Sequence, residues 1–151
     1  MIVRRCAEFS ADFPDDGVVE NDWYVRQPGR NLTAVICEKL SDRRWNVSGP
    51  DFAGDHGWTL DVDLPKRRFW VQVSAGLNEG RQLLMSEDHS KMFKARQWPA
   101  DDPYPAFLRD LHAVLTADAR FGDIRWFNFD KRGDNEQDHG PEPVSDEAAP
   151  A

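Results

Sequence analysis

The residues of this chain best suited to metal binding or acid–base catalysis lie around its first histidine. Asp55 precedes His56, and Asp61 and Asp63 follow it two positions apart. Residues two apart on a strand point to the same side, so these last two carboxylates can converge. Carboxylates bind hard cations, and a histidine extends the choice to transition metals. The alternative is that the carboxylates keep a sheet face soluble and pair with Arg68. We take this alternative and predict no metal and no catalytic residue.

Motifs of nucleophilic and phosphate chemistry are absent from the sequence. The glycine-containing segment 49–54 lacks the Lys-Ser or Lys-Thr ending of a phosphate loop and does not lead into a predicted helix. No Gly-x-Ser-x-Gly elbow occurs. Cys6 and Cys37 have no adjacent histidine, and two cysteines in a cytosolic protein are usually small buried apolar residues. We therefore expect a protein that is not an enzyme and carries no cofactor.

Tryptophan is the other unusual feature, with six residues in the chain. Trp70 is predicted to lie on the wet face of a hairpin, and exposed aromatic side chains anchor protein interfaces or stack ligands. Trp23 and Trp98 lie in polar stretches, where loops can cover them. The binding site predicted on the hairpin face consists of Asp61, Asp63, Arg68, Trp70 and Gln72.

The hairpin that carries this site is the clearest predicted element. Apolar residues occupy every second position from Trp58 to Leu64, and again from Phe69 to Ala75. A period of two gives each strand one buried face and one wet face. The wet face carries acids on the first strand and Arg68, Trp70 and Gln72 on the second, which favours antiparallel pairing.

Two amphipathic helices are predicted on either side of the hairpin. The first covers residues 30–43, where apolar residues recur at helical spacing and Asn31 is placed to cap the start. The second begins with Asp102 as N-cap and Pro103 as its first residue, and an apolar stripe follows. Gly122 lies just past its end.

The remaining segments complete an α+β fold. Further strands are predicted at residues 2–9, 45–48, from 83 onward, and 124–129. The order β-α-β-β-β-β-α-β favours a two-layer sandwich, a mainly antiparallel sheet with both helices packed on one face. Residues 10–28 form a long loop with one short strand at Trp23–Val25, and loops of this length are often functional or mobile.

Charge divides the chain into two parts. There are 27 acidic and 19 basic residues, a net charge of −8, and residues 134–151 hold six of the acids and no Lys or Arg. Residues 131–151 show no periodicity. We therefore predict a single domain over 1–130 and a disordered acidic tail over 131–151. Deleting 134–151 should leave binding by the sheet face mostly intact.

Bulk properties exclude several functions. The length of 151 residues fits one domain, and the longest apolar runs are far shorter than a membrane span needs. Charged residues enter at Arg4, which is not typical of a secretory signal. We expect a cytoplasmic protein. The acidic balance disfavours nucleic acid as a partner.

Three segments carry a resemblance to known domains: 57–63 (Gly-Trp-Thr-Leu-Asp-Val-Asp), 69–73 (Phe-Trp-Val-Gln-Val) and 124–126 (Ile-Arg-Trp). Across residues 29–129 the pattern resembles small uncharacterised bacterial domains, some of which look like immunity proteins of polymorphic-toxin systems. The resemblance implies a stoichiometric inhibitor that blocks a partner protein, such as a toxin or effector, by covering it.

Alternatives remain beside this protein-binding inhibitor. A nucleic-acid-mimicking anti-defence inhibitor or an acidic secretion chaperone fits the same charge. A small-molecule-binding protein predicts an apolar pocket between sheet and helices. A metal-dependent enzyme predicts that His56 and the carboxylates cluster. An open sheet has two edge strands, so a monomer or a homodimer is compatible with the sequence.

Overall fold

A seven-stranded antiparallel sheet is the centre of the computed structural model, which describes residues 1–76, 80–91 and 97–146. The strand order is β10-β9-β2-β8-β7-β6-β5. The strands of this sheet are β2 (Cys6–Ala11), β5 (Val47–Phe52), β6 (Trp58–Leu64), β7 (Arg67–Ala75), β8 (Arg81–Asp88), β9 (Phe121–Phe129) and β10 (Glu136–Gly140). Two-stranded pairs join β1 (Ile2–Val3) to β11 (Val144–Ser145) and β3 (Val18–Glu20) to β4 (Trp23–Arg26).

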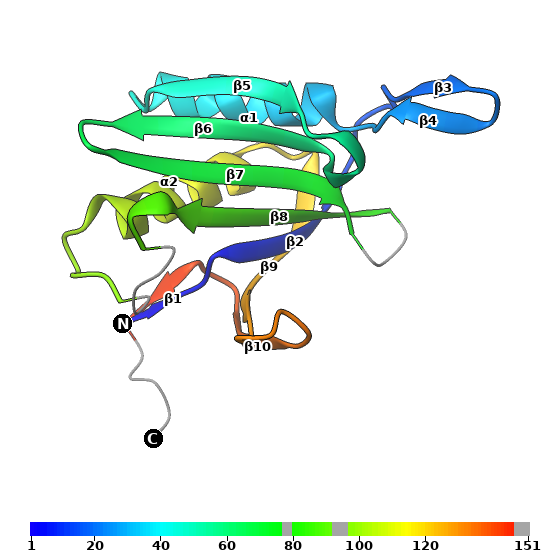
Figure 1. Ribbon diagram of the computed structural model, residues 1–151. Helices are drawn as coiled ribbons and strands as arrows, with labels where there is room; N and C mark the ends of the chain where they lie inside the picture. Colours follow the sequence, from blue (N-terminus) through cyan, green and yellow to red (C-terminus); the bar gives the residue numbers. More distant parts are fainter. Residues whose placement is uncertain (77–79, 92–96, 147–151) are drawn as a thin grey trace.

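Both helices, α1 (Arg30–Asp42) and α2 (Pro103–Ala117), lie on one face of this sheet (Figure 1). Their apolar stripes meet alternate strand residues in one core, which includes Ile36, Val71 and Leu111, each fully buried. Within the part of the chain that the structure describes, neither α-helix lies on the opposite face of the sheet (Figure 1). The prediction of an α+β two-layer sandwich is confirmed. Among the described helices, none is long and apolar enough to cross a membrane.

The predicted hairpin forms as β6 and β7, which the alternation of apolar residues specified. Trp58, Leu60 and Val62 face the core from β6, and Phe69 and Val71 from β7. The register pairs Asp61 with Trp70 and Asp63 with Arg68 across the two strands. The wet-face residues of the hairpin therefore lie on the helix-free face, because the core residues between them point the other way.

The start of α2 is fixed by the predicted cap and by a buried ion network. The Asp102 side chain accepts a hydrogen bond from the Tyr104 amide, with Pro103 at the first helical position. Arg67 binds the same carboxylate at 2.8 Å and the Asp88 carboxylate at 2.6 Å. Asp88 is 1% exposed, so this guanidinium both neutralises a buried charge and ties the helix to β7 and β8.

The first helix begins differently from the prediction. Its N-cap is Gly29, in a left-handed conformation, rather than Asn31. The cap function falls to Asp16, whose carboxylate accepts hydrogen bonds from the Gly29 and Asn31 amides, both at 2.7 Å. A carboxylate at this end of a helix is favourable because it faces the positive end of the helix dipole.

The predicted first strand over 2–9 is split into β1 and β2 by Arg4 and Arg5. The Arg5 amide donates to the Asn128 side chain, while the Arg4 amide donates to the Pro143 carbonyl at 2.7 Å. Gly122, predicted to follow α2 as a terminator, lies inside β9, and the predicted strand at 45–48 begins at Val47 and continues to Phe52.

The predicted disordered tail is wrong for residues 131–146. Residues 136–140 form β10 against β9, and 144–145 form β11 against β1. Arg4 ties this segment to the domain, because it is 4% exposed and donates to the carbonyls of Asp138 and Glu142 and to Ser145 Oγ. Val144 adds a 5%-exposed apolar side chain to the core. Residues 147–151, also in the predicted tail, lie outside the described residues.

Candidate functional site

The five residues of the predicted binding site all lie on β6 and β7. Their side chains are on the helix-free face of the sheet, because they alternate with residues that face the core. Two of them are engaged with each other: Arg68 Nε donates to Asp63 Oδ1 at 2.7 Å, and both side chains are exposed. Exposed pairs of this kind contribute little to stability, so this one chiefly keeps the face polar. Asp61 lies opposite Trp70, and Gln72 lies opposite Thr59.

Trp70 is half-buried on this face between two acidic residues. Its cross-strand neighbours are Asp61 on β6 and Glu87 on β8. Glu87 forms an ion pair with Arg5 at 2.5 Å. Trp70 is therefore less exposed than the sequence alone suggested. Its role as a binding anchor stays a prediction.

A chain of paired charges crosses β8, β2, β9 and β10 on the helix-free face. Glu8 on β2 binds Arg81 at 2.7 Å and Arg125 at 3.3 Å, and Arg125 continues to Glu136 on β10 at 2.8 Å. These pairs compensate the charges on this part of the face, where Glu8 is itself buried. Cys6 and Phe127, which alternate with the core residues Ala7 and Trp126, are buried on the same face.

The most exposed apolar surface of the described chain is the β3–β4 hairpin, here called the apolar arm (residues 18–26). It projects beyond the end of the main sheet (Figure 1). Trp23 is 78% exposed and Val19 is 54% exposed. The other exposed members are Val18, Tyr24 and Val25. A cluster of large apolar side chains that no other element covers is typical of a protein-interaction site.

The apolar arm is held in one shape at its tip. Asn21 and Asp22 form its two-residue turn and have φ angles of 52° and 66°. Positive φ at both central residues is the requirement of the type I′ turn, whose twist matches that of the flanking strands. The tip is therefore preorganised.

The base of the apolar arm is tied to the domain by side chains. Tyr24 donates its hydroxyl to Asp15 at 2.5 Å, and the Gly17 backbone lies against the Tyr24 ring, where a Cβ would come within 2.6 Å. Trp58 Nε1 donates to the Gln27 carbonyl at 2.9 Å. Isolated two-stranded hairpins are marginal in water, so these contacts explain why an exposed arm keeps its form.

The arm joins a further apolar side chain at the edge of the main sheet. Phe52, at the end of β5, is 40% exposed and packs against Trp58 with the two rings tilted, at 5.3 Å between ring centroids. Arg26, the last residue of β4, lies over the Phe52 ring at 5.7 Å. Arg26 therefore joins the base of the arm to an exposed aromatic ring at the sheet edge.

The metal-binding group considered as an alternative, Asp55, His56, Asp61 and Asp63, is not assembled. Asp55 and His56 lie in the short helix η1 (Gly54–His56), while Asp61 and Asp63 lie along β6, where Asp63 pairs with Arg68. Within residues 1–76, 80–91 and 97–146, no group of three or more His, Cys, Asp or Glu side chains is placed to hold a metal ion. Asp55 and His56 instead line a polar cavity of about 170 Å³ that Gln72 also lines.

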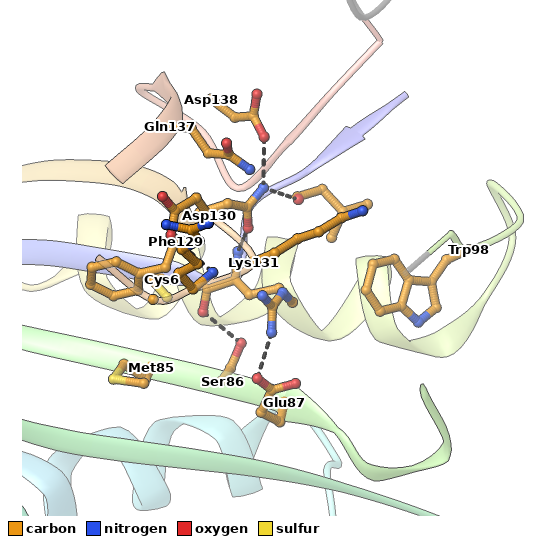
Figure 2. Close-up of a pocket in the computed structure, with 15 residues that line it drawn as sticks. Cys6, Met85, Ser86, Glu87, Trp98, Phe129, Asp130, Lys131, Gln137 and Asp138 are labelled. Atoms are coloured by element: carbon orange, nitrogen blue, oxygen red, sulfur yellow. Dashed lines mark hydrogen bonds and ion pairs between the residues drawn. The ribbon is translucent and has the colours of Figure 1, made fainter. Parts of the chain in front are cut away.

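A larger groove of about 880 Å³ opens where β8, β2 and the β9–β10 turn meet (Figure 2). Figure 2 shows its side chains on two sides, Met85, Ser86 and Glu87 from β8 and Asp130, Lys131, Gln137 and Asp138 from the opposite wall. A small-molecule-binding function predicts an apolar pocket between the sheet and the helices, and this groove lies elsewhere.

The acids of this groove already have partners within the fold. Glu87 binds Arg5, Asp138 accepts from Asn128 Nδ2 at 3.2 Å, and Asp130 accepts from the Arg132 and Asp134 amides. These contacts hold the β9–β10 turn in place. The groove is lined by equal numbers of cationic and anionic side chains, so it favours no ligand charge.

The two candidate nucleophiles, Cys6 and Cys37, have raised pKa values. Burial raises the pKa of the Cys6 thiol to about 12 and that of Cys37 to about 11. At neutral pH both are thiols, which are poor nucleophiles compared with thiolates. Burial also lowers the pKa of His112, whose Nδ1 accepts a hydrogen bond from Trp126 Nε1 at 3.0 Å. This imidazole serves to satisfy a buried indole.

Two tryptophans that fall in polar stretches of the sequence have opposite surroundings. Trp98 is 8% exposed and donates to Asp88 at 2.9 Å, whereas Trp23 projects into solvent. Sequence reasoning placed a short strand at Trp23–Val25 but missed its partner. The sequence does contain a hairpin pattern over residues 18–25: two valines, then the polar turn pair Asn21-Asp22, then the strand-forming residues 23–25.

Comparison of the chain with family models, with curated proteins and with solved structures found no match.

Proposed function

We propose that this protein is a non-catalytic protein-binding module that contacts its partner through the apolar arm. The observation that carries this proposal is the 78% exposure of Trp23 on a projecting hairpin whose tip and base are both held in place. Tryptophan is enriched among the residues that dominate binding energy. A rigid arm loses little conformational entropy on binding, which favours affinity.

The area of the interface must exceed the arm alone. Specific complexes bury about 800 Å² on each partner, more than one short hairpin offers. Phe52, which is exposed at the sheet edge and contacted by Arg26 of the arm, supplies part of the remainder. The binding site predicted around Trp70 remains a second candidate region. A partner bound to the arm contacts it only if the interface extends across several strands of the sheet.

The more specific proposal is a stoichiometric inhibitor of the immunity or anti-defence type. Its support is the resemblance of residues 29–129 and the net charge of −8, which steers an acidic protein toward a basic target. An inhibitor must present a surface that stays formed without its target, and the apolar arm meets that requirement.

The experiment has two stages. The immobilised full chain captures proteins from cells that encode it, and each captured protein is then purified and mixed with the purified chain. The proposal expects an equimolar complex in analytical ultracentrifugation that reforms from the purified components. If none of the captured proteins forms such a complex, the protein-binding proposal fails.

A small-molecule function is the second candidate, favoured by the 880 Å³ groove, whose volume lies within the usual range of ligand sites. A crystal of the chain soaked with a mixture of small fragments tests it. Fragment density in the groove would support this candidate, and density only elsewhere would remove it.

A further inference from the structure

The charged residues around the apolar arm indicate the charge of the partner surface that it fits. Segment 12–26 holds five acidic residues and one basic residue, Arg26, and therefore has a net charge of −4. The acids are Asp12, Asp15, Asp16, Glu20 and Asp22. These fifteen residues thus carry a net charge of −4 in a chain whose net charge is −8.

Two of these acids are used inside the fold, and two are free to act on a partner. Asp15 accepts from Tyr24 and the Gly17 amide, and Asp16 binds the start of α1. Glu20 and Asp22 are exposed at the tip, and neither has an ion pair or side-chain hydrogen bond within the described part of the chain.

The tip carboxylates stand next to the aromatic anchor. Glu20 is the cross-strand partner of Trp23, and Asp22 precedes it in sequence. Alternation along β4 places Trp23 and Val25 on one face of the arm, while Tyr24 turns to the opposite face and is engaged by Asp15. The face of the arm that carries Trp23 therefore presents an exposed indole and an exposed valine, with the carboxylates of Glu20 and Asp22 at its border.

We propose that the apolar arm docks into an apolar cleft of another protein that is rimmed by Lys or Arg side chains. This inference rests on the proposed protein-binding function. The indole and Val25 fill the cleft, while Glu20 and Asp22 meet the basic rim. Desolvated aromatic anchors supply affinity, and complementary charges at the rim speed association and reject partners with the wrong charge.

A second copy of this chain is a poor occupant of the same surface. Each copy carries a net charge of −8, and its segment 12–26 a net charge of −4, so two such segments, or one segment and another copy's surface, repel at neutral pH. The free edge of the main sheet at β5 is also unsuited to strand addition. It contains Pro50 and an irregular register between Ser48 and Asp51.

The test places a photo-crosslinking p-benzoyl-phenylalanine at position 23 of the full chain, and in a separate protein at position 70. Both are irradiated in the cells that encode the protein, and the crosslinked peptides are sequenced. We expect position 23 to label one protein at apolar residues bordered by Lys or Arg.

Binding of that purified protein is then measured against ionic strength. We expect the affinity to fall about tenfold or more between about 50 and 500 mM NaCl, because rim charges are screened by salt. The variant Glu20→Gln/Asp22→Asn should bind more weakly at low salt and lose most of this salt dependence. The matched control Glu38→Gln/Asp42→Asn removes the same charge at exposed positions outside the arm and should behave as the wild type.

Each other outcome overturns a distinct claim. Crosslinks from position 23 to a second copy, or to a surface without basic residues, overturn the basic-rimmed cleft. Crosslinks from position 70 alone overturn the arm as the docking surface but leave the protein-binding function standing. If neither position labels a protein and no equimolar complex forms, the proposed function fails as well.

Discussion

Replacing Arg4 by methionine should detach the C-terminal strands from the domain. Arg4 is 4% exposed, and its guanidinium donates to the main-chain carbonyls of Asp138 and Glu142, the latter at 3.0 Å. Methionine keeps the apolar stem in place, so the change removes the donors without opening a large cavity. The two carbonyls are left without these donors.

The magnitude follows from the number and burial of these bonds. A hydrogen bond to a charged group is worth about 1.5–3 kcal/mol, so two of them give about 3–6 kcal/mol. Because β10 is mostly exposed, water replaces part of the loss, and we expect the free energy of unfolding to fall by about 3 kcal/mol. The loss should concentrate in β10, β11 and β1.

Urea denaturation gives the change in the free energy of unfolding, and amide hydrogen exchange locates it. The amides of 136–146 should exchange much faster in Arg4→Met, while those of β6 and β7 stay protected. The control Arg132→Met removes an exposed guanidinium and should leave both measurements unchanged. A loss below about 1 kcal/mol together with unchanged exchange over 136–146 would refute the role assigned to Arg4.

Three further predictions concern buried polar groups. Asp88→Asn breaks the buried pair with Arg67 and should lower the free energy of unfolding by about 3 kcal/mol in urea, whereas Asp63→Asn, in an exposed pair, should have no measurable effect. The pKa of His112 is lowered by burial, so the unfolded chain binds a proton before the folded one does as the pH falls. Stability should therefore decrease below about pH 6.5, and an equal decrease in His112→Gln would contradict this cause. Burial raises the pKa of Cys6 to about 12 and of Cys37 to about 11, so iodoacetamide should label neither until urea unfolds the chain; labelling of the native protein at the rate of a free thiol would oppose this.

Sequence reasoning succeeded where one local rule decided the structure. The Asp102-Pro103 pair predicted the start of α2, because a capping carboxylate and a preset φ angle act within one turn. Strict alternation from Trp58 to Leu64 predicted β6 and its buried face, because a one-residue shift would expose that whole face.

Sequence reasoning failed where residues far away in the chain determine the local structure. Nothing around residue 138 indicates a strand, because the ordering group is Arg4, more than 130 positions away in the chain. The cap of α1 comes from Asp16 rather than from Asn31, since a loop returns to the helix start. The candidate site was missed in part because Val18–Glu20 is too short and too exposed to show the alternation of a buried strand.

The affinity of the purified partner for three forms of the chain tests the docking surface most directly. Trp23→Ala should weaken binding by about 30-fold or more, the equivalent of about 2 kcal/mol for a central aromatic anchor. Trp70→Ala, at a half-buried position within a paired polar face, should weaken it by less than about threefold. The opposite order, with Trp23→Ala binding as the wild type and Trp70→Ala losing the partner, would place the interface on the helix-free sheet face and contradict the role of the apolar arm.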